Sequence, residues 1–156
     1  MRRMCHSFAH RGPDDEGILL SPPIGLGHRR LSIIDLSPAG HQPMCNEDGT
    51  VWLVFNGEIY DYMELRKELL SRGHRLKSKT DCEVIIHLYE EEGIDCLGRL
   101  NGMFAFALWD AAREKLILGR DRLGIKPLHF FWDGRKLLFA SEIKAILCDP
   151  EVPREI

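Results

Sequence analysis

The chain has 156 residues, and its 44% hydrophobic and 29% charged residues indicate one globular domain rather than a disordered segment. Charges of both signs are interspersed and sum to −3, which gives no electrostatic case for nucleic acid or anionic lipid as a partner. No apolar run approaches the length of a membrane span. The five cysteines are scattered, with no Cys-x-x-Cys pair, and predict reduced thiols, a cytoplasmic protein and no metal site.

The first third of the chain reads as loop interrupted by short strands. Residues 1–23 are polar and rich in turn residues, and a short strand is expected from Ile24 to His28. Val51 to Phe55 is a continuous apolar run, which is typical of a strand buried on both faces. We expect Asn56-Gly57 to end this strand abruptly.

Two helices are predicted next. The first runs from about Tyr60 to Ser71, with Gly73 at its C′ position. A capping box from Thr80 to Glu83 opens the second, which Gly93 closes. Four short strands and a last helix follow, at 104–109, 115–119, 128–132, 137–140 and 141–147. Because strands and helices do not alternate regularly, a layered α+β domain is favoured over a doubly wound parallel sheet.

Three groups of polar residues are candidates for a binding site. Arg30, beside an apolar segment, could grip a carboxylate with two parallel hydrogen bonds or simply lie on the surface. Asn56-Gly57 could supply oxyanion donors, from an amide and a backbone N–H, or form a type I′ turn. Asp81 could bind an ammonium group or complement the dipole of a helix.

Other motifs carry no chemistry by spacing alone. The charged segment from Gly119 to Leu128 suggests an exposed or salt-bridged loop. The chain has no phosphate-binding loop, no dinucleotide fingerprint, no nucleophile elbow and no zincin histidine spacing.

Ordered sequence blocks nevertheless resemble one known family along nearly the whole chain, from about residue 6 to 150. They include His-Arg-Gly-Pro-Asp, Arg-Leu-Ser-Ile-Ile-Asp, Phe-Asn-Gly-Glu-Ile-Tyr, Thr-Asp, Asn-Gly-Met-Phe-Ala-Phe, Arg-Asp-Arg-Leu-Gly-Ile-Lys-Pro-Leu and Ser-Glu-Ile-Lys-Ala, at residues 10–14, 30–35, 55–60, 80–81, 101–106, 120–128 and 141–145. They look like the class II glutamine amidotransferase domain of glutamine-hydrolysing asparagine synthetases.

The resemblance implies an α+β fold, the four-layer αββα sandwich of N-terminal-nucleophile hydrolases. Residues 1–149 would form the amidotransferase domain, and 150–156 would begin a linker to a C-terminal synthetase domain. L-glutamine would be the substrate, and its ammonia would serve the ATP-dependent amidation of aspartate. The amidotransferase domain would need no cofactor, whereas the synthetase domain would use ATP and Mg²⁺. The enzyme could also form a homodimer.

The resemblance assigns roles to individual residues. Arg30 would bind the α-carboxylate of glutamine, and Asp81 would hold its α-ammonium. Asn56 and the N–H of Gly57 would form the oxyanion hole. The remaining pocket residues would be Leu31, Ser32, Ile33, Ile34 and Glu58.

One element of the family's machinery does not appear in the sequence. The family uses a cysteine at the first position of the mature chain, followed by Gly-Ile, and its α-amine acts as the general base. No Cys-Gly-Ile occurs here, and Cys5 lies too close to His10 to take that place. We therefore expect the first strand of the sandwich to be missing and these residues alone to be inactive as a glutaminase. The alternative is a nucleophile-free homologue that binds an amino acid or acts as a scaffold.

Overall fold

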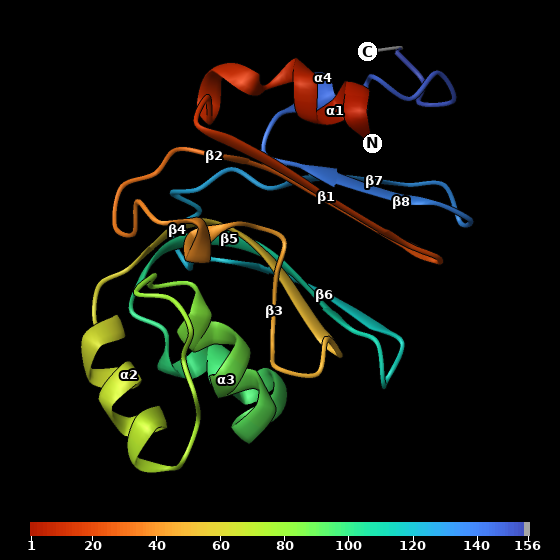
Figure 1. The fold of residues 1–156 in the computed structure, drawn as a ribbon. Helices are drawn as coiled ribbons and strands as arrows, with labels where there is room; N and C mark the ends of the chain where they lie inside the picture. The colour runs from red at the N-terminus through yellow and green to blue at the C-terminus, as the bar shows by residue number, and fades with distance from the viewer. Residues whose placement is uncertain (155–156) are drawn as a thin grey trace.

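The computed structural model describes residues 1–154 and arranges them in four layers, helix, sheet, sheet and helix (Figure 1). The bounds of its helices and strands are α1 (Arg2–Ser7), β1 (Asp15–Ser21), β2 (Ile24–Arg30), β3 (Met44–Cys45), β4 (Val51–Ile59), α2 (Tyr62–Ser71), α3 (Glu83–Glu92), β5 (Gly102–Asp110), β6 (Lys115–Arg120), β7 (His129–Trp132), β8 (Leu137–Ala140) and α4 (Ile143–Ile146). Single 3₁₀ turns occur at Ala9–Arg11 and Pro38–Gly40, and a longer 3₁₀ segment at Gly93–Arg99. The predicted α+β sandwich is confirmed.

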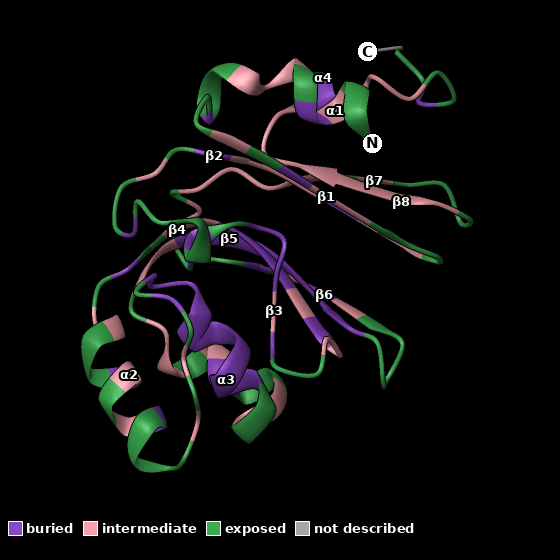
Figure 2. Cartoon of the chain, viewed as in Figure 1, coloured by how far each residue is buried: buried purple, intermediate pink, exposed green. Residues whose placement is uncertain are grey.

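The four-stranded sheet holds the main core. Its four strands lie in the order β3-β4-β5-β6, and all neighbours are antiparallel. One face packs on α2 and α3 through fully buried side chains such as Leu53, Ile85 and Leu88. Figure 2 shows this concentration of burial in β4, β5 and α3. The other face, which includes Val54 and Trp109, packs toward the second sheet layer, which we call the hairpin layer.

The second sheet layer consists of two separate hairpins, β1–β2 and β7–β8. Within residues 1–154, neither hairpin pairs with another strand. An apolar channel of about 150 Å³ runs between β2 and β8, with β4 and β5 as its floor and α1 along one side. We call this channel the β2–β8 slot; its lining includes Met4, Cys5, Gly27, Val54, Ala107 and Phe139.

Several local predictions were wrong. Residues 1–23 contain α1 and β1, which were expected to be loop. Asn56-Gly57 does not end β4, which continues to Ile59. The predicted capping box does not form, because Glu83 accepts hydrogen bonds from the N–H groups of Lys77 and Ser78 instead.

The expected linker begins as ordered structure. Val152 is buried, and Lys136 forms ion pairs with Asp149 and Glu151. The last two residues of that stretch, 155 and 156, lie outside the described residues. None of the helices in the described range is long and apolar enough to cross a membrane.

Candidate functional site

A cavity of about 290 Å³ gathers the predicted site residues. It lies where β2 ends, beside β4 and the segment before α3. Its lining contains every predicted binding residue except Ser32, namely Arg30, Leu31, Ile33, Ile34, Asn56, Gly57, Glu58 and Asp81. The backbone N–H of Ser32 donates to Asp14 instead, so Ser32 helps to position the loop and does not line the cavity.

Arg30 is buried and shapes the loop that follows β2. Its guanidinium donates to the carbonyl oxygens of Ser37, at 3.0 Å, and Asp35. A guanidinium has five N–H donors, so donors remain beyond these two bonds. Arg30 therefore combines a structural role with a cationic group in the cavity wall, which rules out the alternative of a plain surface arginine.

Asp35 joins this loop to the segment that carries Asp81. Its carboxylate accepts the N–H of Ser37 at 2.9 Å and the N–H of Lys79 at 2.8 Å. The hydrogen bonds from Ser37 and Lys79 lower the pKa of Asp35 to about 2. The carboxylate thus stays ionised at neutral pH and holds the two walls of the cavity together.

The edge of β4 presents the Gly57 N–H to the cavity. In an antiparallel strand, alternate residues direct their backbone groups to the same edge. The N–H of Phe55 is taken by Gln42 at 2.7 Å, and that of Ile59 by Asp81 at 2.9 Å. Gly57 lies between them on this edge, beyond the reach of β3, which pairs only with Trp52 and Leu53 of β4.

Glycine is required at this position by packing. A Cβ on Gly57 would collide with the carbonyl oxygen of Met103 and lie 2.7 Å from the Cα of Phe104. The residue therefore sits in a close cross-strand approach rather than in a hairpin turn, so the type I′ alternative is wrong.

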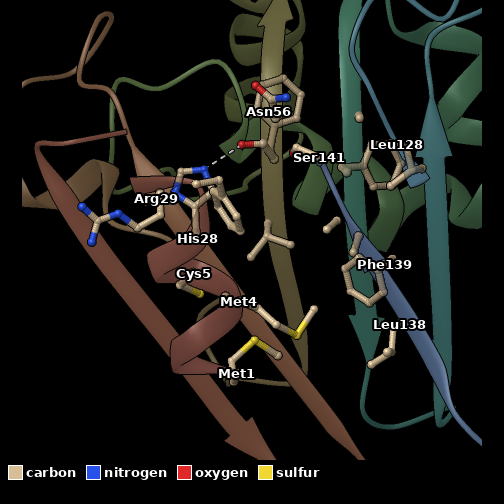
Figure 3. A pocket seen from close by; sticks show the side chains of 18 of the residues that line it. Met1, Met4, Cys5, His28, Arg29, Asn56, Leu128, Leu138, Phe139 and Ser141 are labelled. Atoms are coloured by element: carbon tan, nitrogen blue, oxygen red, sulfur yellow. Dashed lines mark hydrogen bonds between the residues drawn. The ribbon is translucent and has the colours of Figure 1, made fainter. Parts of the chain in front are cut away.

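Two buried polar atoms without a protein partner mark the junction between the cavity and the slot. They are Nδ2 of Asn56 and Nδ1 of His28, and both residues line the cavity and the slot. The other ring nitrogen of His28 lies 3.0 Å from the carbonyl oxygen of Phe55 (Figure 3). Burial lowers the pKa of His28 to about 4, so its ring is neutral at pH 7. Buried polar atoms normally have partners, so this junction suits a polar ligand.

Asp81 is buried, and its carboxylate accepts the N–H of Ile59 at 2.9 Å. Burial raises the pKa of Asp81, and the neighbouring Glu58 adds to the effect. A cation in the cavity would reverse this shift by stabilising the ionised form. The geometry therefore favours the ammonium-binding role over simple helix capping.

The predicted site residues did not include several polar residues of the lining, among them His28 and Lys126. His28 lies at the end of the predicted strand but was given no role in binding. Lys126 lines the cavity because Asp121 accepts the N–H groups of Leu123, Ile125 and Lys126 and folds that loop back. The unusual charge density of the 119–128 segment was the available signal.

Cys5 is not placed to act as the nucleophile. It lies within α1 and is buried, and this burial raises the pKa of its thiol. Its α-nitrogen belongs to a peptide bond and donates to the carbonyl of Met1, so it cannot act as a base. The position of Cys5 therefore agrees with the sequence-based prediction that it is not the nucleophile.

Fold and site together define a layered α+β protein with an amino-acid-sized cavity. A cationic residue, Arg30, and an acidic residue, Asp81, both line this cavity, together with Asn56 and Gly57 of β4. This constellation suits acyl transfer from a small zwitterionic substrate.

Comparison with known proteins identifies the family. The chain matches the glutamine amidotransferase domain model over residues 1–156, and it belongs to that family. It is 46% identical to asparagine synthetase [glutamine-hydrolyzing] 2 of Bacillus subtilis, over 99% of this chain and 20% of that protein. It is 40% identical to a putative asparagine synthetase of Methanocaldococcus jannaschii, over 99% of this chain and 33% of the relative. Amidase chry2 of Gibberella zeae is 49% identical over 90% of this chain and 21% of its own length.

A solved structure confirms the fold. Glutamine phosphoribosylpyrophosphate amidotransferase from B. subtilis superposes with a TM-score of 0.77 at 21% identity, over 92% of this chain and 39% of that one. The chain spans only about a fifth to a third of the curated relatives named above.

Proposed function

We propose that this domain binds L-glutamine and takes part in its hydrolysis to glutamate and ammonia. The observation that carries the proposal is the meeting of Arg30, Asp81, Asn56 and Gly57 around one cavity. Arg30 would hold the α-carboxylate and Asp81 the α-ammonium. This orientation sends the side-chain amide toward Asn56 and Gly57.

The oxyanion hole follows from the two donors on β4. Attack on the amide carbon places negative charge on its oxygen, and donors that are already oriented stabilise that charge without reorganisation. The Asn56 side-chain N–H and the Gly57 backbone N–H are such donors. Asn56 belongs to the set of buried groups without a protein partner, which agrees with a donor kept for a substrate.

The nucleophile would enter through the β2–β8 slot. Its two bordering strands offer open edges, and its lining is apolar, so it suits an extended apolar segment. The slot ends at His28 and Asn56, so a cysteine at the tip of this segment would meet the amide carbon. The thiol would form a γ-glutamyl thioester and release ammonia, and water would then free glutamate.

In the whole protein, we propose that ammonia passes to a C-terminal synthetase domain. That domain would bind ATP and Mg²⁺ and amidate aspartate, in line with the names of the asparagine synthetase relatives. The five free cysteines support a reducing, cytoplasmic location.

The second candidate is a domain that binds an amino acid without turnover. Arg30 and Asp81 line the cavity in a way that suits binding alone, because neither residue needs a nucleophile to hold an amino acid. The two candidates agree on glutamine binding and differ on catalysis.

The test is a glutaminase assay on this chain, with and without an N-terminal extension that begins Cys-Gly-Ile. We expect activity only with the extension, and Asn56→Ala to lower kcat by about 10²–10³-fold. Cys5→Ser is the matched control and should retain activity in the extended protein. Glutamine binding without turnover in both forms would favour the second candidate, and no binding in either would refute both.

A further inference from the structure

A histidine–carboxylate cluster lies away from the glutamine cavity, on the helical layer. It consists of His74, just after α2, and His87 and Glu90, one turn apart on α3. None of the three lines the cavity. Among residues 1–154, this is the group of histidine and acidic side chains whose ligand atoms converge as a metal site requires.

The three ligand atoms form a compact triangle. Nδ1 of His87 lies 3.2 Å from Nδ1 of His74 and 2.8 Å from Oε2 of Glu90. The third side, from Nδ1 of His74 to Oε2 of Glu90, is 3.6 Å. A tetrahedral zinc ion with bonds of about 2.0–2.2 Å separates its ligand atoms by about 3.3–3.5 Å. An ion would fit after the His87–Glu90 side opened by about 0.5 Å.

Hydrogen bonds alone satisfy this triangle poorly. If Nδ1 of His87 donates to Glu90, it cannot also donate well to His74. Nε2 of His74 lies 2.9 Å from Oε1 of Glu91. If Nε2 carries the proton and donates to that carboxylate, Nδ1 of the neutral ring has only a lone pair and can only accept. Lone pairs of His74 and Glu90 therefore converge beside His87, whose side chain is only 2% exposed.

The surroundings have the pattern that orients metal-binding histidines. The outer nitrogen of His74 lies 2.9 Å from Oε1 of Glu91, whereas that of His87 is 4.0 Å from Glu83, which is beyond hydrogen-bond range. Oε1 of Glu90 accepts a hydrogen bond from Asn46 at 2.8 Å, which leaves Oε2 for the triangle. Carboxylate partners of this kind fix the tautomer and the ring orientation of histidine ligands.

The position of His74 is fixed by the backbone. Gly73 adopts a φ of 97°, and the N–H of His74 returns to the carbonyl of Leu69 at 3.1 Å. The loop after α2 is thus closed before any metal binds, which lowers the entropy cost of binding.

We propose that His74, His87 and Glu90 bind a divalent transition metal, with zinc as the best match. Two imidazoles and one carboxylate suit zinc or cobalt better than magnesium or calcium, which prefer oxygen ligands. Water would complete the tetrahedron, because the side chains of Glu90 and His74 remain 26% and 16% exposed. The metal would clamp α3 to the start of the segment that leads to Asp81.

The test uses the purified, metal-stripped chain. Cobalt(II) should give the visible d–d bands of a tetrahedral site at one equivalent, and zinc should displace it. Zinc should raise Tm, since it binds the folded state, whereas magnesium should not. Both effects should disappear in His74→Ala and persist in His6→Ala, an exposed histidine on α1 that serves as the matched control.

A graded variant protects the test against misfolding. Glu91→Gln keeps all three ligands and should weaken zinc binding by about 10–100-fold. Equal zinc affinity in the wild type and His74→Ala, or cobalt binding without tetrahedral bands, would overturn the proposal. The outcome is independent of glutaminase activity, because no residue of the cluster lines the glutamine cavity.

Discussion

The neutral, buried His28 is expected to make the domain less stable in mild acid. Burial lowers its pKa from 6.5 to about 4, and the nearby charge of Arg30 acts in the same direction. Between these two values the unfolded chain binds a proton that the folded chain does not. Stability therefore rises with pH across this window and is lost as pH falls from 6.5 toward 4.

The size of the effect follows from the window. Each pH unit within it is worth about 1.4 kcal/mol, so unfolding should become about 2 kcal/mol easier between about pH 7.5 and 5. That is a large part of a total stability of about 5–15 kcal/mol. Urea unfolding at the two pH values measures this loss directly. His28→Gln should abolish it, because glutamine can still donate to the Phe55 carbonyl but does not titrate.

The comparison between wild type and His28→Gln cancels the contributions of the other groups. Asp81 is one such group, with the opposite sign, because its raised pKa favours the folded state as pH falls. His6→Gln, at an exposed position, should keep the wild-type dependence. If His28→Gln loses as much stability as the wild type over this range, the neutral buried ring is not its source.

Three further substitutions test the cavity. Asp81→Asn should raise Tm at neutral pH. Burial of the ionised carboxylate destabilises the folded state above the unfolded pKa of Asp81, near 3.8, and asparagine carries no such charge. The same variant should abolish glutamine binding in calorimetry. Gly57→Ala should lower stability by about 1–3 kcal/mol in urea unfolding, since its methyl would strike Met103, whereas Gly98→Ala, with open space around it, should not. Arg30→Lys should cost about 1–3 kcal/mol, because it leaves a loop carbonyl without its donor, and should weaken glutamine binding despite the retained charge.

The four-stranded sheet could be predicted from the sequence because its signals are local. The apolar runs of β4 and β5 and the glycines that close α2 and α3 are each visible within a few residues. By contrast, β1 begins Asp-Glu-Gly and has a strand conformation only because it pairs along its whole length with β2. The extension of β4 past Asn56 likewise depends on Ala105 and Met103 across the sheet.

Site residues show the same division between local and long-range signals. Arg30, Asn56, Gly57 and Asp81 were singled out, and the structure brings them to one cavity. The metal-binding triangle was not foreseen, since His87 lies 13 positions after His74 and no short motif joins them. Only the antiparallel packing of the segment after α2 against α3 makes them neighbours.

The two sheet layers make unequal contributions to the site. Asn56 and Gly57 belong to β4, whose side chains are mostly buried, whereas Arg30 ends β2, and β7 and β8 have no fully buried residue. An extended segment in the β2–β8 slot would cover apolar groups such as Leu138 and Phe139, and each such side chain would contribute about 1.5–3 kcal/mol when fully buried. The segment that brings the nucleophile would therefore also complete the core of the hairpin layer. Catalysis and the stability of that layer would then depend on the same contacts.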